Sequence, residues 1–226
     1  MQHPANFDSA DLPALIDDVG RRYAGASRFV QGFVRGKLRG DPATLAVLQH
    51  AAVMRFGAVT DLGSGRGQLG LALLAARLAD SVAGFDLDAA KLADATRAAT
   101  DLPARYAVAD LATAAVPDCD TVLLIDVLLQ MQEVAQRALL GRVVAAARRQ
   151  VLIRAFDPDR GWRTAVGRGM ERAGCRIRGD GSVLCPLPLA TLAAPFEAAG
   201  FMVSVAPCWG RTPLPNVLLV ARRDRP

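Results

Sequence analysis

The sequence predicts an α/β fold: a doubly wound, mostly parallel sheet of seven strands whose last strand is antiparallel, with additional N-terminal helices. Short apolar runs of strand length alternate with longer segments of helical periodicity. A turn with three alternating glycines, Gly63, Gly65 and Gly67, follows the first apolar run and precedes a helical pattern. The last two apolar runs are joined by a short connection, which indicates an antiparallel pair because parallel neighbours need a long crossover.

The first part of the chain is expected to be helical. Apolar side chains recur at helical spacing over residues 11–50, and a new helix is expected at Asp41-Pro42, with Asp41 as its N-cap. This stretch is basic: Arg21, Arg22, Arg28, Arg35, Lys37 and Arg39. We therefore predict an N-terminal helical extension over residues 1–52 that covers a ligand pocket, and a Rossmann-like nucleotide-binding domain over residues 53–226.

The remaining elements follow in alternation. The first strand is expected to end at Asp61, and the helix after the glycine turn to reach about Ala79. A second strand is expected over Ser81–Asp86, followed by a helix with Asp88 as N-cap. Further strands are predicted over 104–109, 120–126, 150–156, 201–206 and 216–222, and helices over 132–149 and 187–199.

Composition excludes several classes of protein. The chain has 226 residues and is 52% hydrophobic, yet it lacks an apolar run of the ~18–20 residues that a membrane span needs. The N-terminal segment is acidic where a signal peptide would be basic and then apolar, so we expect a cytoplasmic protein without a membrane span. The net charge of +5 is modest, and arginines on solvated helix faces account for it.

Cysteine and histidine usage predicts no metal site. The four cysteines show no C-x-x-C spacing, and the chain has only two histidines, His3 and His50. Cys208 follows Pro207 near the end of the sixth predicted strand, and we interpret it as a packing residue.

Acidic residues end four successive predicted strands: Asp61, Asp86, Asp110 and Asp126. The glycines alone also match the dinucleotide pattern G-x-G-x-x-G, through Gly65, Gly67 and Gly70. An acid directly before the turn instead favours a positively charged ligand such as S-adenosylmethionine. Asp86 can accept hydrogen bonds from both ribose hydroxyls, and Asp110 can accept one from an adenine amino group. Leu87 and Leu111 are then expected on the two faces of the adenine ring.

The stretch Asp61-Leu62-Gly63-Ser64-Gly65-Arg66-Gly67 resembles motif I of class I S-adenosylmethionine-dependent methyltransferases, and the resemblance extends over residues 59–222. It implies S-adenosyl-L-methionine as cofactor and S-adenosyl-L-homocysteine as product. The predicted cofactor-binding residues are Asp61, Gly63, Ser64, Gly65, Gly67, Asp86, Leu87, Asp110, Leu111 and Asp126. Asp126 is also the predicted catalytic residue, because the end of the fourth strand lies beside the transferable methyl group in this family.

Two further stretches, residues 28–42 and 212–222, resemble small methyltransferases associated with aryl-polyene pigment biosynthesis. This resemblance implies a phenolic or polyene-carboxylate acceptor. Members of that group carry a histidine three residues after the acid of the fourth strand, whereas this chain has Leu129. The difference implies another base, another acceptor or weakened catalysis.

Acceptor-side residues are less defined by the sequence. Arg154, Asp157, Trp162 and Arg163 are candidates for contact with the acceptor, and the segment 157–180 lies where this fold inserts a lid. In the N-terminal extension, Tyr23 or an arginine is a candidate to hold the methionine carboxylate of the cofactor.

Three alternatives stand beside a small-molecule methyltransferase. The basic extension permits an RNA methyltransferase, but the Pro-Pro-aromatic stretch of enzymes that methylate nucleobase amines is missing after Asp126. A nucleic-acid partner is therefore not expected. Because Leu129 stands where the related methyltransferases carry a histidine, a non-catalytic protein that binds S-adenosylmethionine is the second alternative. A dehydrogenase is the third alternative, and binding of NAD would distinguish it.

Overall fold

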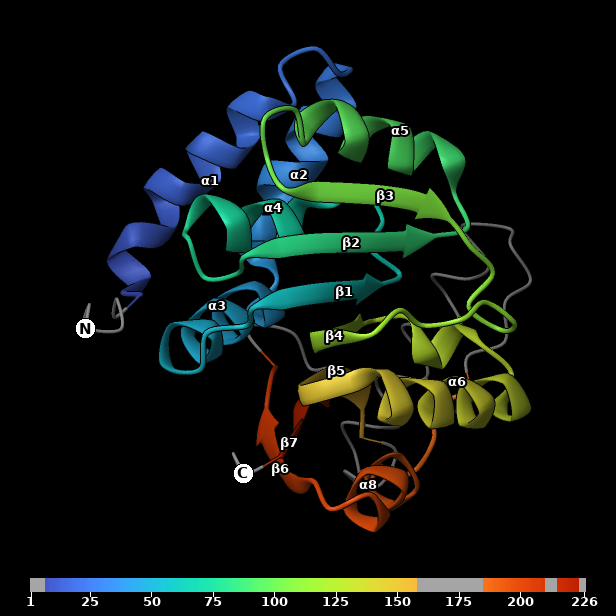
Figure 1. Cartoon of the computed structure of the whole chain (residues 1–226). Coiled ribbons are helices and arrows are strands. Elements are labelled where there is room, and N and C mark those ends of the chain that lie inside the picture. Colours follow the sequence, from blue (N-terminus) through green and yellow to red (C-terminus); the bar gives the residue numbers. More distant parts are fainter. Residues whose placement is uncertain (1–6, 158–184, 210–214, 224–226) are drawn as a thin grey trace.

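The protein is described from a computed structural model that covers residues 7–157, 185–209 and 215–223. Over these residues it forms a seven-stranded sheet in the order β3-β2-β1-β4-β5-β7-β6 (Figure 1). The strands are β1 (Ala58–Leu62), β2 (Ser81–Asp86), β3 (Ala104–Val108), β4 (Cys119–Ile125), β5 (Ala147–Phe156), β6 (Met202–Pro207) and β7 (Asn216–Arg222). The first five are parallel to one another, and β7 is antiparallel to both β5 and β6. The predicted fold class is confirmed.

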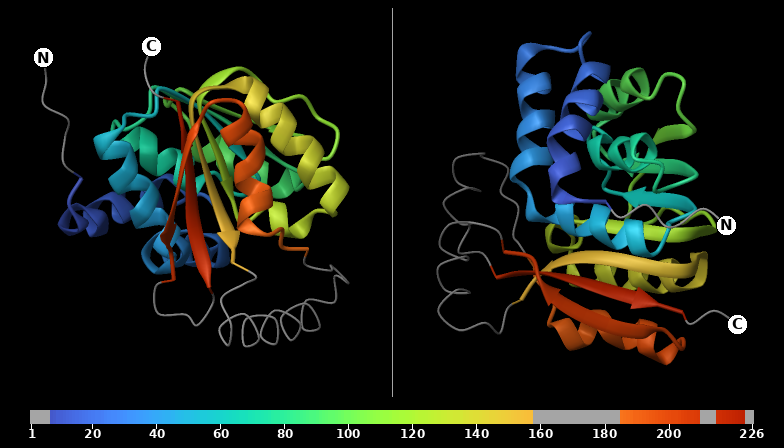
Figure 2. Two further views of the ribbon diagram at one scale, coloured as in Figure 1. Left: turned by 90° about the horizontal axis from the view of Figure 1, so that it is seen from below. Right: turned by 90° about the vertical axis from the view of Figure 1, so that its left-hand side faces the viewer.

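The helices cover both faces of the sheet. They are α1 (Leu12–Arg22), α2 (Arg28–Gly40), α3 (Pro42–Val53), α4 (Gln68–Ala75), α5 (Ala89–Ala98), α6 (Glu133–Ala146) and α8 (Leu189–Ala198). Two short 3₁₀ turns are η1 (Ser9–Asp11) and η2 (Leu128–Gln130). Figure 2 shows α1 and α2 side by side, and α6 and α8 on the other side of the sheet. No helix in the described part of the chain is both long and apolar enough to cross a membrane.

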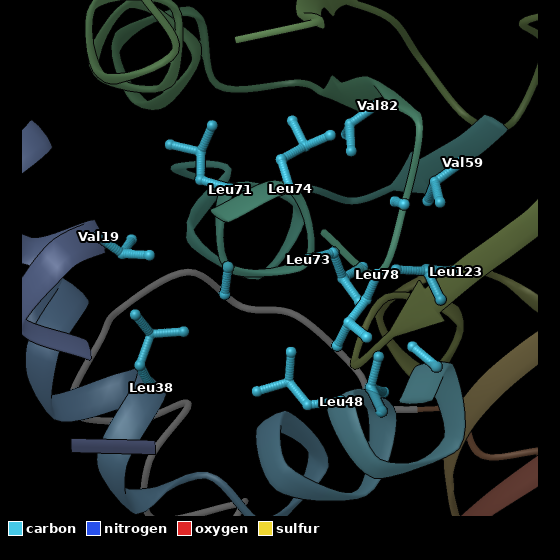
Figure 3. Packing of buried hydrophobic residues seen from close by; sticks show 14 of the residues in the cluster. Val19, Leu38, Leu48, Val59, Leu71, Leu73, Leu74, Leu78, Val82 and Leu123 are labelled. Carbon is cyan, nitrogen blue, oxygen red and sulfur yellow. The ribbon is translucent and has the colours of Figure 1, made fainter. Parts of the chain in front are cut away.

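The N-terminal helices share one hydrophobic core with the sheet. Val19 of α1, Leu38 of α2 and Leu48 of α3 belong to the same buried cluster as Leu71 and Leu73 of α4 (Figure 3). A second cluster on the opposite face joins α6 and α8 to the sheet. The extension is therefore built into the packed interior on one face of the sheet.

Local capping agrees with the sequence at several helix starts. Asp41 accepts a hydrogen bond from the backbone amide of Ala43 at the start of α3, and Asp88 caps α5 through the amides of Ala90 and Lys91. Ser27 caps α2, which breaks the helical stretch predicted over residues 11–50 into separate helices.

Two predicted helices are too long. The helix expected to reach about Ala79 ends at Ala75, because Arg77 adopts a positive φ of 57° and turns the chain toward β2. The helix predicted over 132–149 ends at Ala146, and β5 begins at Ala147, where it pairs with Cys119 of β4. At this junction, pairing with a neighbouring strand determines the backbone conformation, although the local sequence has helical periodicity.

Candidate functional site

A pocket of about 690 Å³ lies at the carboxyl ends of β1, β2 and β4, and side chains of α2 and the start of α3 line it as well. Ligands of open α/β sheets bind at this edge, where the strand order reverses on either side of the first strand. The charged side chains that line the pocket include six acids and three bases: Asp41, Asp61, Asp86, Asp88, Asp110, Asp126, Lys37, Arg66 and Lys91. This excess of acid favours a ligand that carries positive charge.

The glycine turn forms one wall of the pocket. Gly63, Gly65 and Gly67 all have a positive φ, of 80°, 55° and 74°, as the sequence pattern predicts. The amides of Gly63 and Ser64 donate to the carbonyl of Phe85 at 2.8 and 3.0 Å. Gly63, Ser64 and Gly65 line the pocket, whereas Gly67 does not.

The three positions of this turn differ in what a side chain larger than glycine would contact. A Cβ on Gly67 would lie 2.6 Å from the ring of Tyr106, and one on Gly63 would lie 2.8 Å from the side chain of Val127. Only at Gly65 would a Cβ meet open space. At Gly63 and Gly67 protein packing by itself already excludes a side chain, whereas Gly65 has no such neighbour.

Asp86 lies at the end of β2 and holds the turn in place. Its Oδ2 accepts from the amide of Gly65 at 2.9 Å, and its Oδ1 accepts from the amide of Asp88 at 2.9 Å. Each carboxylate oxygen has a second lone pair, so Asp86 can still accept hydrogen bonds from a ligand in the pocket.

Asp61 lies at the base of the pocket, on β1, and is 3% exposed. Burial, and then the negative charge of Asp86, raise the pKa of its carboxyl group to about 7. A cationic ligand beside Asp61 would offset both effects, because an opposite charge favours the ionised carboxylate.

The predicted adenine region lines the same pocket. Asp110 follows β3, and its Oδ1 accepts from the amide of Ala112 at 2.9 Å. Leu111 is buried and Leu87 is exposed, and both line the pocket. Their side chains and the Asp110 carboxylate are thus available at one end of the pocket.

Two buried polar atoms on the turn side have no hydrogen-bond partner among the described residues: Ser64 Oγ and Gln68 Oε1. Both residues line the pocket. Buried polar atoms in folded proteins are normally paired, so these two are ready to bind a polar ligand. Ser64 was predicted as a site residue, and Gln68 was not.

Asp126 belongs to a network of four charged side chains at the other end of the pocket. Its Oδ2 accepts from Arg154 Nη1 at 2.8 Å and from Lys37 Nζ at 3.2 Å. Asp41 pairs with the same two cations, through Oδ1 to Arg154 at 2.7 Å and through Oδ2 to Lys37 at 2.6 Å. Two positive and two negative charges are thereby balanced where α2, α3, β4 and β5 meet.

Burial and charge act in opposite directions on Lys37. Burial lowers the pKa of its ammonium group, but the carboxylates of Asp126 and Asp41 outweigh this effect, and the pKa is raised overall. Lys37 therefore remains charged. Arg154 is almost fully buried, with 8% of its side chain exposed, and the two carboxylates compensate its buried charge.

The backbone of Asp126 is unusual. Its φ is +62°, in the left-handed region that non-glycine residues rarely adopt. Gln130 Nε2 donates to its carbonyl at 2.6 Å and so supports this conformation. Strained residues of this kind gather at functional sites, where the surrounding contacts maintain them.

The structure places other predicted residues away from the pocket. Tyr23 donates its hydroxyl to the carbonyl of Arg66, and Arg22 donates to the carbonyls of Ala98 and Thr100. Of the basic residues noted in the extension, Lys37 lines the pocket. Trp162 and Arg163 lie outside the described residues.

Leu129 does not line the pocket, and its carbonyl accepts from the amide of Cys185 at 2.9 Å. Cys208 is buried, and burial raises the pKa of its thiol, which suits the packing role inferred for it. No cluster of three metal-ligating side chains occurs within residues 7–157, 185–209 and 215–223.

Sequence reasoning missed part of the charged network. Asp41 was recognised only as a helix cap, although it also pairs with Arg154 and Lys37. A signal was present: Arg154 interrupts the apolar run over residues 151–156, and a buried arginine requires a carboxylate partner.

Comparison with solved structures identifies the same architecture in methyltransferases. The magnesium protoporphyrin IX methyltransferase of Synechocystis PCC 6803, with bound S-adenosylhomocysteine, aligns with a TM-score of 0.64 and 21% identity over 95% of this chain and 96% of its own. An O-methyltransferase from neocarzinostatin biosynthesis, in complex with S-adenosylhomocysteine and 1,4-dihydroxy-2-naphthoic acid, aligns with a TM-score of 0.61 and 21% identity over 91% and 60% of the two chains.

The fold is shared across acceptor classes. The small RNA methyltransferase HEN1 aligns with a TM-score of 0.62 and 13% identity, over 81% of this chain and 25% of its own. A search of curated protein sequences found no match. Residues 32–151, more than half of the chain, match the model of the methyltransferase small domain. This protein therefore belongs to the methyltransferase small domain family.

Proposed function

We propose that this protein transfers a methyl group from S-adenosyl-L-methionine to a small-molecule acceptor. One observation carries the proposal: Asp61, Asp86 and Asp110, which lie at or just after the carboxyl ends of three neighbouring strands, line a single pocket together with the glycine turn. The cofactor combines a ribose, an adenine and two positive charges, and each has a suitable partner among these carboxylates.

The pocket residues fit this cofactor. The partnerless atoms Ser64 Oγ and Gln68 Oε1 offer hydrogen bonds on the turn side, and the excess of acidic lining side chains suits a sulfonium and an ammonium group. We assign Asp86 to the ribose hydroxyls, Asp110 to the adenine amino group, and Leu87 and Leu111 to the ring faces. Asp61 would balance the positive charge of the cofactor. The turn residues Gly63 and Gly65 would approach it through their backbone.

The sulfonium supplies an activated methyl group, so the protein has mainly to align the acceptor and exclude water. Alignment of this kind can lower a barrier by ~7–11 kcal/mol. We assign the alignment to Asp126, because Lys37 and Arg154 both hold its Oδ2 and fix its position at the pocket. Asp126 thus acts as an orienting carboxylate whose charge two cations already balance.

A small acceptor is favoured over RNA by the contacts of the basic extension. Arg22 is committed to backbone carbonyls, Arg21 pairs with Asp18, and Lys37 belongs to the charged network. These three side chains have partners within the protein, which reduces the positive charge that the extension offers to phosphates. Apolar lining by Phe33, Val127 and Met131 suits a phenolic or polyene-carboxylate acceptor, the class that the resemblance of the chain ends implies.

The first test is calorimetric titration with S-adenosylmethionine, S-adenosylhomocysteine and NAD. We expect micromolar binding of the first two and none of NAD. Asp86→Ala is expected to abolish binding, whereas Asp118→Ala, on an exposed carboxylate that pairs with Arg148, should leave it unchanged. Binding of NAD in preference to S-adenosylmethionine would refute the proposal.

Asp86 also holds the turn, so its ribose contact needs a separate measurement. S-adenosylhomocysteine should bind the wild type more tightly than its 2′-deoxy analogue, and Asp86→Asn should reduce this difference. An unchanged difference would show that Asp86 acts only through the backbone of the turn. Transfer of a labelled methyl group to a panel of phenols and carboxylates, with RNA as the comparison, tests the acceptor class.

A further inference from the structure

The chain has two tyrosines, and both contact the glycine turn. Tyr23, directly after α1, donates its hydroxyl to the carbonyl of Arg66 at 2.5 Å. Tyr106, on β3, donates to the carbonyl of Gly67 at 3.4 Å. Two side chains from distant parts of the sequence thus bind consecutive carbonyls of one turn.

The residues of this turn differ in whether they line the pocket or contact the tyrosines. Gly63, Ser64 and Gly65 line the pocket, and neither tyrosine does. The ring of Tyr106 packs closely against Gly67 and Gly84, so closely that a Cβ on either glycine would collide with it. Tyr106 therefore contacts Gly67, which does not line the pocket, whereas Tyr23 binds the carbonyl of Arg66, a residue that lines it.

Both hydroxyls are suited to act as permanent donors. Tyr23 is 2% exposed, and burial, followed by the charge of Asp94, raises the pKa of its phenol. Burial also raises the pKa of Tyr106, with a contribution from Tyr23. Both phenols therefore stay protonated at neutral pH, so each carbonyl keeps its donor.

The Arg66 side chain adds a further restraint on the same residue. Its guanidinium pairs with Asp94 and lies 5.9 Å from the ring centre of Phe33 on α2. Residue 66 is thus held through its carbonyl by the end of α1 and through its side chain by α5 and α2. The N-terminal helices thereby restrain the turn.

We propose that Tyr23 and Tyr106 are positioning residues for the cofactor, which fix the carbonyls of Arg66 and Gly67 and so hold Gly63–Gly65 in the conformation that binds it. The inference rests on the proposed function. It assigns α1 a part in cofactor affinity without direct contact, since a turn already held in place loses less freedom when a ligand binds.

The test uses Tyr23→Phe and Tyr106→Phe, which remove only the hydroxyls. Loss of one buried hydrogen bond predicts about five- to tenfold weaker binding of S-adenosylhomocysteine for Tyr23→Phe. The effect of Tyr106→Phe is expected to be smaller, because its hydrogen bond is longer. The matched control is Thr121→Val, which removes a buried hydroxyl that donates to the Phe56 carbonyl at 2.7 Å, away from the pocket.

All three variants should lower the melting temperature, but only the two tyrosine variants should weaken binding. Equal affinity of Tyr23→Phe and the wild type would overturn the inference and leave the proposed function intact. Failure of the wild type to bind S-adenosylmethionine or S-adenosylhomocysteine would overturn both.

A second measurement is made on the wild type and uses a variant only to assign the signals. Labelling with ring-¹³Cζ tyrosine gives one NMR signal for each of the two residues, and Tyr23→Phe assigns them, or Tyr106→Phe if Tyr23→Phe does not fold. Addition of S-adenosylhomocysteine to the wild type should leave both signals close to their ligand-free positions, because the two hydroxyls already hold the turn before the ligand binds. A large shift of both signals at saturation would show that the ligand, and not the tyrosines, orders the turn, and would contradict the inference.

Discussion

At the scale of single residues, Asp61 has the most demanding environment in the pocket. It is almost fully buried, and the carboxylate of Asp86 is close enough to raise its pKa further. When folding raises the pKa of an acid, ionisation of that acid favours the unfolded state. This effect begins at about pH 4, where the acid ionises in the unfolded chain. The ionised carboxylate of Asp61 lowers the stability of the ligand-free protein, and a bound cationic ligand would offset this loss.

We predict that the affinity for S-adenosylmethionine rises with pH between about 6 and 8. Below the Asp61 pKa of about 7 the ligand must displace a proton, and above it the carboxylate is already ionised. Titration calorimetry in buffers of different ionisation enthalpy would measure the proton released. Asp61→Asn should bind more weakly and lose this pH dependence.

The stability of the ligand-free protein has the opposite pH dependence: it falls as the pH rises, whereas the affinity for the ligand increases. The contribution of Asp61 to the free energy of unfolding falls as the pH rises from about 4 to 7, because only the unfolded state ionises freely in that window. Asp61→Asn should therefore be more stable than the wild type at pH 8. A less stable variant with an unaltered pH profile of binding would contradict the role given to Asp61.

At the scale of elements, the strand–turn–helix unit from β1 to α4 separates two roles of glycine. Gly65 lines the pocket and has open space where a Cβ would be, whereas Gly67 faces Tyr106. Both have a positive φ, so both carry a similar backbone cost when replaced. Replacement by alanine therefore differs between the two positions only in the surroundings of the added methyl group, which are open space at Gly65 and the ring of Tyr106 at Gly67.

We predict that Gly67→Ala lowers the free energy of unfolding by about 3 kcal/mol, from backbone strain and overpacking together. Gly65→Ala should lower it by about 1–2 kcal/mol, the backbone cost alone. Gly65→Ala should nevertheless bind S-adenosylhomocysteine at least about tenfold more weakly, since its methyl group enters the pocket. Urea denaturation and calorimetry measure the two quantities, and equal stability of the two variants would refute the distinction.

The charged network also acts between elements. Lys37 on α2, Asp41 before α3, Asp126 after β4 and Arg154 on β5 are held by mutual ion pairs. Removal of one member would leave two like charges to share a single partner, so that one charge of the network is no longer compensated, and this gives Arg154 a structural role in addition to its predicted place on the acceptor side. The network joins the N-terminal helices to the strand ends on which the proposed reaction depends.

At the scale of the whole molecule, the predicted boundary at residue 52 crosses a continuous core. Buried residues of α1, α2 and α3 belong to the same cluster as those of α4 and the sheet. The extension also supplies pocket residues from α2 and the turn restraint from Tyr23. Its role in covering the pocket stays a prediction.

We predict that residues 53–226 alone do not fold cooperatively, because removal of the first three helices exposes one side of this core to water. A fragment without a sharp thermal transition that binds the dye ANS would support this. A matched pair of variants tests the same point in the full chain. Val19→Ala, at 0% exposure, should cost about 2 kcal/mol, and Val53→Ala, at 71% exposure, less than about 0.5 kcal/mol. A stable fragment that binds S-adenosylmethionine would instead establish an independent domain.

Local pattern was sufficient for the fold and for much of the candidate site. Alternating apolar runs predicted the strands, capping residues predicted the starts of α3 and α5, and acids at strand ends predicted which side chains meet at the pocket. These inferences succeed because strand ends of a parallel sheet lie at a common edge whatever the details of packing.

Only the tertiary structure decided the contacts between residues far apart in the sequence. Lys37 meets Asp126 across 89 positions, and Tyr23 meets Arg66 across 43. The same is true of the neighbours that require glycine at Gly63 and Gly67. Periodicity describes which face of an element is buried, but it carries no information on which side chain from another element packs against that face. For this reason the pocket was predictable from sequence, whereas the network and the tyrosines that hold it together were not.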